Sequence, residues 1–338
     1  MLIDHFKQKI RPDKHSRTLW QSIHIDITLL SLLLLLAATG LFILYSASGE
    51  SLRTIELQAA RLLIAFTVMF LFAQISPVTL QRSAMWLYGI GIFTLVIVLI
   101  IGHIGKGAQR WLNLGIIHFQ PAELMKLAIP LLLADYYHKN TLPISLKSTL
   151  AAVPIIFIPA LLTAKQPDLG TAILLTCAGA SVLFFAGLSF RIIFALGAGF
   201  ALVAPFAWYI LHDYQRQRVL TFLNPENDPL GTGYHIIQSK IAIGSGSFFG
   251  KGWLNGTQSN LHFLPEHTTD FIFAVCGEEF GFVGSLFLII LFMSIVLRGL
   301  YITLHAQDTF SRLVAGSITF TFFISFFINC LSSFFSSF

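Results

Sequence analysis

The chain alternates long apolar runs with short polar connections. An apolar run of about 20 residues is enough to cross the ~30 Å of hydrocarbon in a bilayer. Such runs can be placed near 26–47, 56–75, 84–102, 121–138, 149–164, 168–187, 190–211, 271–297 and 313–331, the fourth to sixth of them short or interrupted. The pattern predicts an all-α fold, a polytopic membrane helical bundle of nine spans, with residues 1–338 forming a single integral membrane domain.

One connection is far longer than the others and separates the seventh span from the eighth. It covers residues 212–269, and loops beyond about 15 residues without regular structure are usually functional or disordered. Within it, the segment 234–243 predicts an interfacial helix that turns its isoleucines toward lipid, namely Ile236, Ile237, Ile241 and Ile243. We therefore expect a large loop with a structured element of its own.

Composition agrees with a membrane protein. Hydrophobic residues make up 55% of the 338 and charged residues 11%, against about 25% charged residues in a soluble domain. The positive-inside rule makes residues 1–24 a cytoplasmic tail, because the tail carries Lys7, Lys9, Arg11, Lys14 and Arg17. Alternation of the spans then places the loop 212–269 on the outer face. The first span is too long for a signal-peptide core, so it predicts an uncleaved anchor.

The remaining composition limits the chemistry. The net charge of +5 suits a protein that works beside anionic lipid or phosphate, and no feature indicates nucleic acid. Cys177, Cys276 and Cys330 fall inside predicted spans and no CxxC motif occurs, which argues against a disulfide framework or a thiolate metal site. The histidines show no metal-ligand spacing, so the sequence predicts no metal site.

Three stretches place a proline and an acid at the start of an apolar helix: "FQPAELMK" (119–126), "KQPDLGT" (165–171) and "LPEHTTDF" (264–271). Proline is tolerated in the first helical turn, and an acid there meets the positive end of the helix dipole. An ordinary helix cap explains any one of them. All three helices begin on the outer side, however, so we expect one membrane face to gather Glu123, Lys126, Asp168, Glu266 and Asp270.

The helix that follows Asp270 predicts the direction of that side chain. At 100° per residue, the small residues Ala274, Gly277, Gly281 and Gly284 lie on the same face as Asp270. Membrane helices use such stripes to pack closely, so we expect Asp270 to point into the bundle. Glu278 and Glu279 lie deeper and off this face, and we expect them to be structural and bonded to neighbouring helices.

Cations accompany these acids on the predicted outer side. They are Arg110, Lys126, Lys165, Arg216, Arg218, Lys240 and Lys251. A carboxylate at a membrane boundary, with cations and helix amino termini around it, suits a substrate with a phosphate head and a lipid tail. It equally suits a coupled-ion site in a transporter.

Five ordered blocks resemble a known family. They are "LYSAS" (44–48), "GAQRWLNLGIIHFQPAELMKLA" (107–128), "KQPDLGTA" (165–172), "GYHIIQSKIAIGSGSFFGKGW" (233–253) and "LPEHTTDFIFAVCGEEFGFVG" (264–284). The chain is similar to the SEDS proteins (shape, elongation, division and sporulation), and more to the elongation (RodA) type than to the division type. The resemblance runs from about residue 25 to 325.

This resemblance implies a peptidoglycan glycosyltransferase of the bacterial inner membrane with a periplasmic active site. Such an enzyme polymerises lipid II, an undecaprenyl-pyrophosphate-linked disaccharide pentapeptide, into β-1,4-linked glycan strands and releases undecaprenyl pyrophosphate, for cell-wall elongation and rod shape. The implied partners are a class B penicillin-binding protein transpeptidase and other membrane proteins of the elongation complex. The implied chemistry has room for a divalent cation, for which the sequence shows no ligand cluster.

The resemblance also implies roles for individual residues. The essential acid of the family falls on Asp270, as the general base. Other family site positions match Glu123, Lys126, Asp168 and Arg110. We expect substrate contacts from these four and from three further residues of the same side: Lys165, Arg218 and Glu266.

Two expectations remain open. The family continues into a tenth span with a "PLPFxSYGG" motif, whereas this sequence ends in "ISFFINCLSSFFSSF", so we expect nine spans and a truncated or frameshifted carboxyl end. The alternatives to an enzyme are a lipid II flippase or transporter and a non-catalytic scaffold for the transpeptidase. A transporter favours polar residues across the midplane and internal repeats, whereas the motifs here gather at one face.

Overall fold

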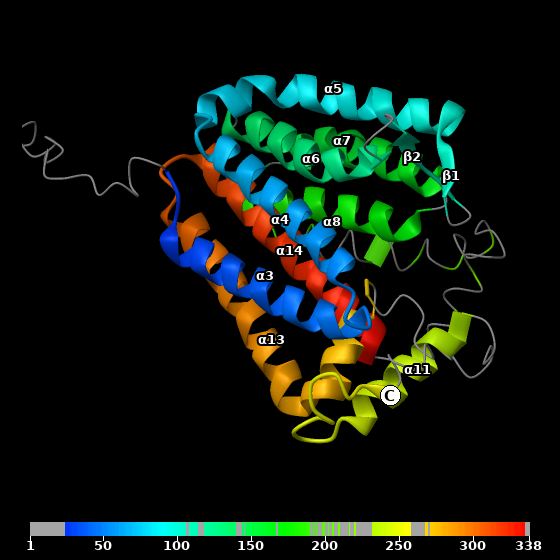
Figure 1. The fold of residues 1–338 in the computed structure, drawn as a ribbon. Helices are drawn as coiled ribbons and strands as arrows, with labels where there is room; N and C mark the ends of the chain where they lie inside the picture. The colour runs from blue at the N-terminus through cyan, green and yellow to red at the C-terminus, as the bar shows by residue number, and fades with distance from the viewer. Residues whose placement is uncertain are drawn as a thin grey trace, which may run out of the picture.

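The computed structural model describes residues 24–105, 108–113, 118–139, 144, 146–166, 168–189, 232–257, 268–269 and 271–334, with isolated positions between 192 and 220. Its helices are α3 (Ile27–Ala47), α4 (Leu52–Ala73), α5 (Pro77–Ile101), α6 (Pro121–His138), α7 (Leu146–Lys165), α8 (Leu169–Phe185), α11 (Thr232–Ser245), α13 (Ile272–His305) and α14 (Thr309–Phe334). They form the helical bundle of Figure 1. The predicted all-α membrane fold is confirmed.

The predicted spans correspond to these helices, except for 190–211, which lies almost entirely outside the described residues. Within the described part, six helices are long and apolar enough to cross a membrane: α3, α4, α5, α7, α13 and α14. Helix α8 is a shorter apolar helix. Apart from His24, the polar tail 1–24 also lies outside the described residues. So does about half of the loop 212–269, whose described part is mainly α11 and the segment that follows it up to Thr257.

A small sheet, which the hydrophobic pattern did not predict, connects α5 to α6. Its strands are β1 (His103–Gly105), β2 (Ala108–Asn113) and β3 (His118–Phe119), in antiparallel order β1-β2-β3. The strands are too short for a period-two pattern to stand out. The sheet brings Arg110, on β2, to the start of α6.

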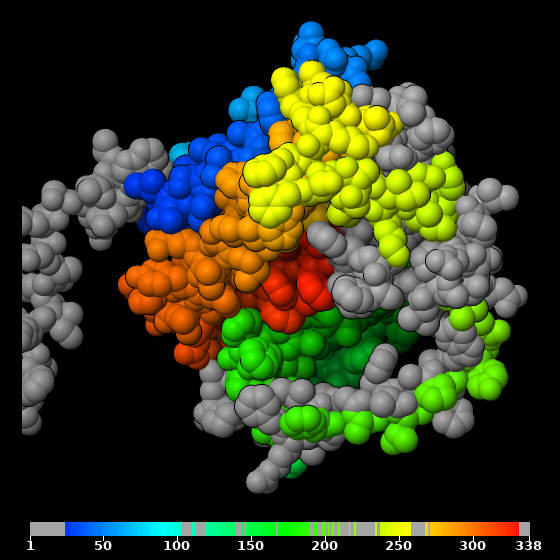
Figure 2. All heavy atoms as spheres, turned by 90° about the horizontal axis from the view of Figure 1, so that it is seen from below, coloured from blue at the N-terminus to red at the C-terminus, as the bar shows by residue number. Residues whose placement is uncertain are grey.

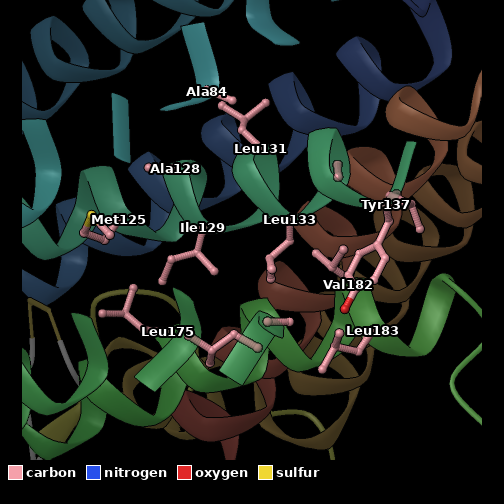
Figure 3. Close-up of a cluster of buried hydrophobic side chains, with 14 of the residues drawn as sticks. Ala84, Met125, Ala128, Ile129, Leu131, Leu133, Tyr137, Leu175, Val182 and Leu183 are labelled. Atoms are coloured by element: carbon pink, nitrogen blue, oxygen red, sulfur yellow. The ribbon is translucent and has the colours of Figure 1, made fainter. Parts of the chain in front are cut away.

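The main core lies where α5, α6, α7, α8 and α14 meet. Met125, Ile129, Leu133 and Tyr137 repeat every four residues along α6, so they share one face of that helix, and all four are fully buried. Figure 3 shows this face directed at Leu175, Val182 and Leu183 of α8. Small residues let the helices approach closely, since a Cβ at Gly91 of α5 would overlap the side chain of Met125.

Helix α13 is broken at Gly281, which has φ +64° and ψ −153°. In a continuous helix the amides of Phe282 and Val283 would donate to the carbonyls of Glu278 and Glu279. Here those amides donate instead to the carbonyls of Ser247 (3.0 Å) and Phe248 (3.2 Å). The two released carbonyls accept from the amides of Lys251 and Gly252, each at 3.0 Å.

The segment Gly246–Gly252, which we call the clamp loop, therefore inserts into the break and satisfies four backbone groups. Figure 2 shows this part of the chain, in yellow, lying over the orange of α13. Its fit depends on glycine, because a Cβ at Gly246 or Gly250 would overlap the carbonyls of Gly277 or Glu279. A Cβ at Gly281 would overlap the amide nitrogen of Gly250.

The break corrects two expectations. A single helical face running from residue 270 through Gly284 is wrong from Gly281 onward, because the backbone leaves helical geometry there. The expectation that Ile243 faces lipid is also wrong. Its Cγ1 lies 3.1 Å from where a Cβ of Gly277 would stand, so it packs under α13, whereas Ile241 is exposed.

At the opposite end of α13, Arg298 ties this helix to the start of α3. Its Nε and Nη2 donate to the two carboxylate oxygens of Asp26, at 3.1 and 2.7 Å. Asp26 also caps α3 by accepting from the amide of Leu29 at 2.8 Å. The hydrogen bond from Arg298 holds the pKa of the Asp26 carboxyl below its usual range.

Because the clamp loop lies against Gly281, the fold leaves no room for a side chain at this position. We expect Gly281→Ala to lower the free energy of unfolding by about 2 to 4 kcal/mol, because an L-residue is strained at this φ and its Cβ would meet backbone that cannot yield. The matched control is Gly244→Ala on α11, where an added Cβ would have no atom within 4 Å apart from the neighbouring backbone of its own helix. Thermal unfolding in detergent checks this, and equal melting temperatures for the two variants would contradict it.

The Asp26 pair makes stability depend on pH. A carboxyl with a lowered pKa in the folded state stabilises that state above its unfolded pKa of about 3.9. This contribution is lost as the pH falls through the folded-state pKa. We expect Asp26→Asn to lower the melting temperature at pH 7 and to have a shrinking effect below about pH 4, and in an Arg298→Gln background to have little effect at either pH. If the melting temperatures of Asp26→Asn and the parent differed by the same amount at every pH, the ionised Asp26–Arg298 pair would not be the cause.

Candidate functional site

The predicted site residues that the structure describes gather at one end of the bundle. The first turns of α6 and α8 lie at the end that carries β2 (Figure 1). Figure 1 shows α3 and α5 running in the same direction, so α3 ends on the side where β1 and β2 follow α5. The first turns of α13 lie there too, because Glu279 accepts a hydrogen bond from the hydroxyl of Ser46 in the last turn of α3. The described starts of α6, α8 and α13 therefore share one end of the bundle, whereas Glu266 and Asp270, predicted beside them, lie outside the described residues.

Asp168 connects three elements at this end. It is the amino-terminal cap of α8 and accepts from the amide of Thr171 at 3.2 Å. Its Oδ2 accepts from Nε2 of Gln120 at 3.1 Å and lies 3.7 Å from Nε of Arg110. The carboxylate is nearly buried, so these donors and the helix dipole stabilise its charge in place of water.

Glu123 and Lys126 form an ion pair on the first turns of α6, with Nζ 2.7 Å from Oε2. The helix begins with Pro121, and its cap, Gln120, makes no side-chain capping bond, which leaves the Gln120 amide for Asp168. Glu123 is 55% exposed and Lys126 21%. The pair thus presents an accessible carboxylate and holds an ammonium close to the helix.

Of the other predicted site residues, the structure describes Lys165. Lys165 is exposed at the last turn of α7, three residues before the α8 cap, Asp168. Asp270, Glu266 and Arg218 lie outside the described residues. Phe271, which follows Asp270 in the sequence, is described and is the residue before α13.

Glu278 and Glu279 are both bonded within the fold, and the expectation of a bond to a neighbouring helix is met by Glu279, whereas the hydrogen bonds of Glu278 run to a connecting segment. Glu278 is fully buried and accepts from Nζ of Lys251 at 2.7 Å and from the amide and hydroxyl of Thr257 at 2.8 and 2.9 Å. Its partners belong to the connecting segment after α11, whereas Ser46, the partner of Glu279, belongs to a neighbouring helix. Lys251, grouped by its charge with the phosphate-binding cations, is instead engaged by this acid.

Two residues of this end were missed from the sequence. Gln120 stands directly before the helix-starting Pro121, which is a cap position, and this could have singled it out. Thr257 gives no such signal. Its contact joins an irregular segment to Glu278 on α13, 21 positions later, and no local pattern marks it. Within the described part of the chain, no group of three or more His, Cys, Asp or Glu side chains is placed to hold a metal ion.

Comparison with known proteins shows the family. Residues 26–334 match the family model of FtsW, RodA and SpoVE, described as "Cell cycle protein". The chain belongs to this family of membrane proteins.

Two curated relatives illustrate the similarity. The chain is 49% identical over 319 residues to "Peptidoglycan glycosyltransferase MrdB" of Escherichia coli (strain K12), covering 93% of this chain and 85% of the relative. It is 36% identical over 317 residues to "Probable peptidoglycan glycosyltransferase FtsW" of Trichlorobacter lovleyi, covering 90% and 82%.

Solved structures agree with the fold. A structure described as "Structural coordination of polymerization and crosslinking by a peptidoglycan synthase complex" matches with a TM-score of 0.78 and 32% identity, over 91% of this chain and 87% of that one. The crystal structure of Thermus thermophilus rod shape determining protein RodA matches with a TM-score of 0.66 and 25% identity, over 90% and 84%.

Asp168 has a structural role that can be separated from its charge. We expect Asp168→Ala to lower the free energy of unfolding by about 1 to 3 kcal/mol, because it removes a helix cap and the acceptor for Gln120. Asp168→Asn keeps an oxygen for the cap, so we expect a loss of less than about 1 kcal/mol. Melting temperatures in detergent test this, and an Asn variant as unstable as the Ala variant would show that charge dominates.

Proposed function

We propose that this protein is a peptidoglycan glycosyltransferase that polymerises lipid II into β-1,4-linked glycan strands for cell-wall elongation and rod shape. The observation that carries the proposal is the cluster of Asp168, Arg110 and Gln120 beside the starts of α6 and α8, at the bundle end where α13 also begins. The identity of 49% with a relative named as such an enzyme supports it.

The substrate would bind through its pyrophosphate. Helix amino termini and arginine or lysine side chains are the groups that bind phosphate in proteins. Arg110 and Lys126 are each held by an acid, Asp168 and Glu123, so they are positioned before a ligand arrives. In this proposal Lys165, Arg218 and Glu266 complete the polar surroundings, and the lipid tail remains in the bilayer beside the apolar helices.

The reaction needs one base. Asp270 would take the proton of the 4-hydroxyl of the acceptor GlcNAc, whose oxygen then attacks C1 of the donor MurNAc. The bond from C1 to the pyrophosphate breaks with inversion, and undecaprenyl pyrophosphate leaves with the electron pair. General-base assistance contributes typically 10²–10⁴-fold, and the cations neutralise the charge that develops on the leaving group.

The setting follows from the same proposal. The site lies on the periplasmic side of the bacterial inner membrane, and a class B penicillin-binding transpeptidase is the partner. The similarity to a chain of a complex described as coordinating polymerization and crosslinking supports this partner. No converging set of three metal-ligating side chains exists among the described residues, so no step is assigned to a divalent cation.

Asp270→Asn tests the base directly. We expect it to lower lipid II polymerisation by the purified protein with its transpeptidase by at least about 100-fold, because the amide keeps the shape but not the basicity. The matched control is Asp135→Asn, the same change at the other end of α6, where the carboxylate binds Lys139 and Gln81.

Gel analysis of the glycan products measures both rates. Full glycan synthesis by Asp270→Asn would refute the base assignment. Polymerisation absent from the parent, together with lipid II crossing vesicles that contain it, would favour the transporter.

A further inference from the structure

The break at Gly281 turns the beginning of α13 into a separate half-helix. It runs from Ile272 to Phe280, about 13 Å at 1.5 Å per residue. Because its hydrogen bonds to the rest of α13 are replaced at Phe282 and Val283, its orientation is not imposed by the long second half. Its orientation is set by its packing against α3 and α11, where Phe273, Ala274 and Val275 are buried, and by the contacts that hold its end at the break.

The clamp loop holds that end by backbone contacts. Lys251 and Gly252 donate to the last carbonyls of the half-helix, while Ser247 and Phe248 accept from the helix beyond the break. The loop therefore bonds to both halves at once. The residue that follows the loop, Trp253, stacks on Phe42 of α3 with ring centroids 4.6 Å apart, which ties the end of the loop to α3.

Two fully buried carboxylates of the half-helix bond to this part of the chain. Glu279 accepts from the backbone of Leu254 and Gly256, after the clamp loop, and Glu278 holds the clamp loop itself. Glu278 belongs to the half-helix, and its Oε1 accepts from Lys251 within the clamp loop and from Thr257 just beyond it. A fully buried acid left without its cation is strongly unfavourable. The ion pair therefore couples the position of the loop to that of the half-helix.

The opposite end of the half-helix leads to the proposed base. Phe271 is its capping residue, and Asp270 directly precedes Phe271 in the sequence. A nine-residue helical segment moves as a rigid body. A shift of its clamped end thus moves the backbone that carries Asp270 relative to the cluster around Asp168.

We infer that Lys251 and Glu278 are positioning residues for the glycosyl transfer, acting through the clamp loop on the half-helix that carries Asp270. This inference rests on the proposed function. It adds that the clamp loop sets the position of the base from the opposite end of the half-helix, about 13 Å away along the helix axis. Neither residue touches substrate, because each side chain is occupied by the other.

This role predicts a particular kinetic change. Misplacement of a catalytic group by about 1 Å can cost 10²-fold in rate, whereas the cations proposed to bind pyrophosphate lie on β2 and α6, which the clamp loop does not hold. We therefore expect Lys251→Met and Glu278→Gln to lower kcat by roughly 10- to 100-fold while KM for lipid II stays within about twofold. Lys251→Arg retains a cation and restores most of kcat.

The experiment measures kcat, KM and melting temperature for these variants with the transpeptidase partner. The matched control pair is Lys139→Met and Asp135→Asn, which breaks an ion pair of similar length, 2.8 Å, at the other end of the bundle and leaves kcat unchanged. In the double variant Lys251→Met/Glu278→Gln, the loss in kcat is smaller than the product of the single losses. Should either single variant fold poorly, Thr257→Val removes one donor to Glu278 and gives a smaller loss in kcat.

Two outcomes overturn the inference. One is parental kcat in folded Lys251→Met and Glu278→Gln. The other is an equal loss of kcat in Lys251→Arg and Lys251→Met, since a merely structural residue gives no rescue by the conservative change. Asp270→Asn in the same assay separates the two proposals: full activity defeats the proposed base, while its inactivity beside fully active clamp variants defeats only the positioning role.

Discussion

Two backbone hydrogen bonds of helix α13 are exchanged for four with the clamp loop, and much of this end of the molecule depends on that exchange. A broken helix inside a membrane protein leaves amides and carbonyls that lipid cannot satisfy. Here Ser247, Phe248, Lys251 and Gly252 satisfy all four groups released around Gly281. The glycines of the loop make this close approach possible. The burial of Glu278 follows from it.

The sequence predicted the bundle well because a membrane span leaves a strong signal. About 20 apolar residues between polar connections define a helix whatever its neighbours are, and Pro121 and Asp168 correctly marked helix starts. The break at Gly281 gave no comparable signal. A glycine among small residues in an apolar run indicates close helix packing equally well, and only the loop that approaches it in three dimensions decides between the two.

The candidate site shows the same difference between local contacts, which a sequence can reveal, and contacts between distant segments, which it cannot. Asp168 could be predicted because caps are local, and its two interpretations turn out to be compatible: it caps α8 and also organises Arg110 and Gln120. The partners of Glu278 could not be predicted, since the contact joins the helix to an irregular segment without periodicity. Charge alone placed Lys251 among phosphate-binding cations, whereas a buried acid on α13 engages it. The base role of Asp270 came from the resemblance to the family, because a carboxylate before an apolar helix is equally an ordinary cap.

Amide hydrogen exchange in lipid nanodiscs tests the central claim most directly, with mass-spectrometric peptides that cover 247–253 and 278–284. Although 247–253 contains almost no regular structure, the account predicts that the amides of Lys251 and Gly252 exchange as slowly as those in the middle of α13, because they are bonded to buried helix carbonyls. Exchange of these two amides at the rate of an unstructured segment, with α13 still protected, would contradict it.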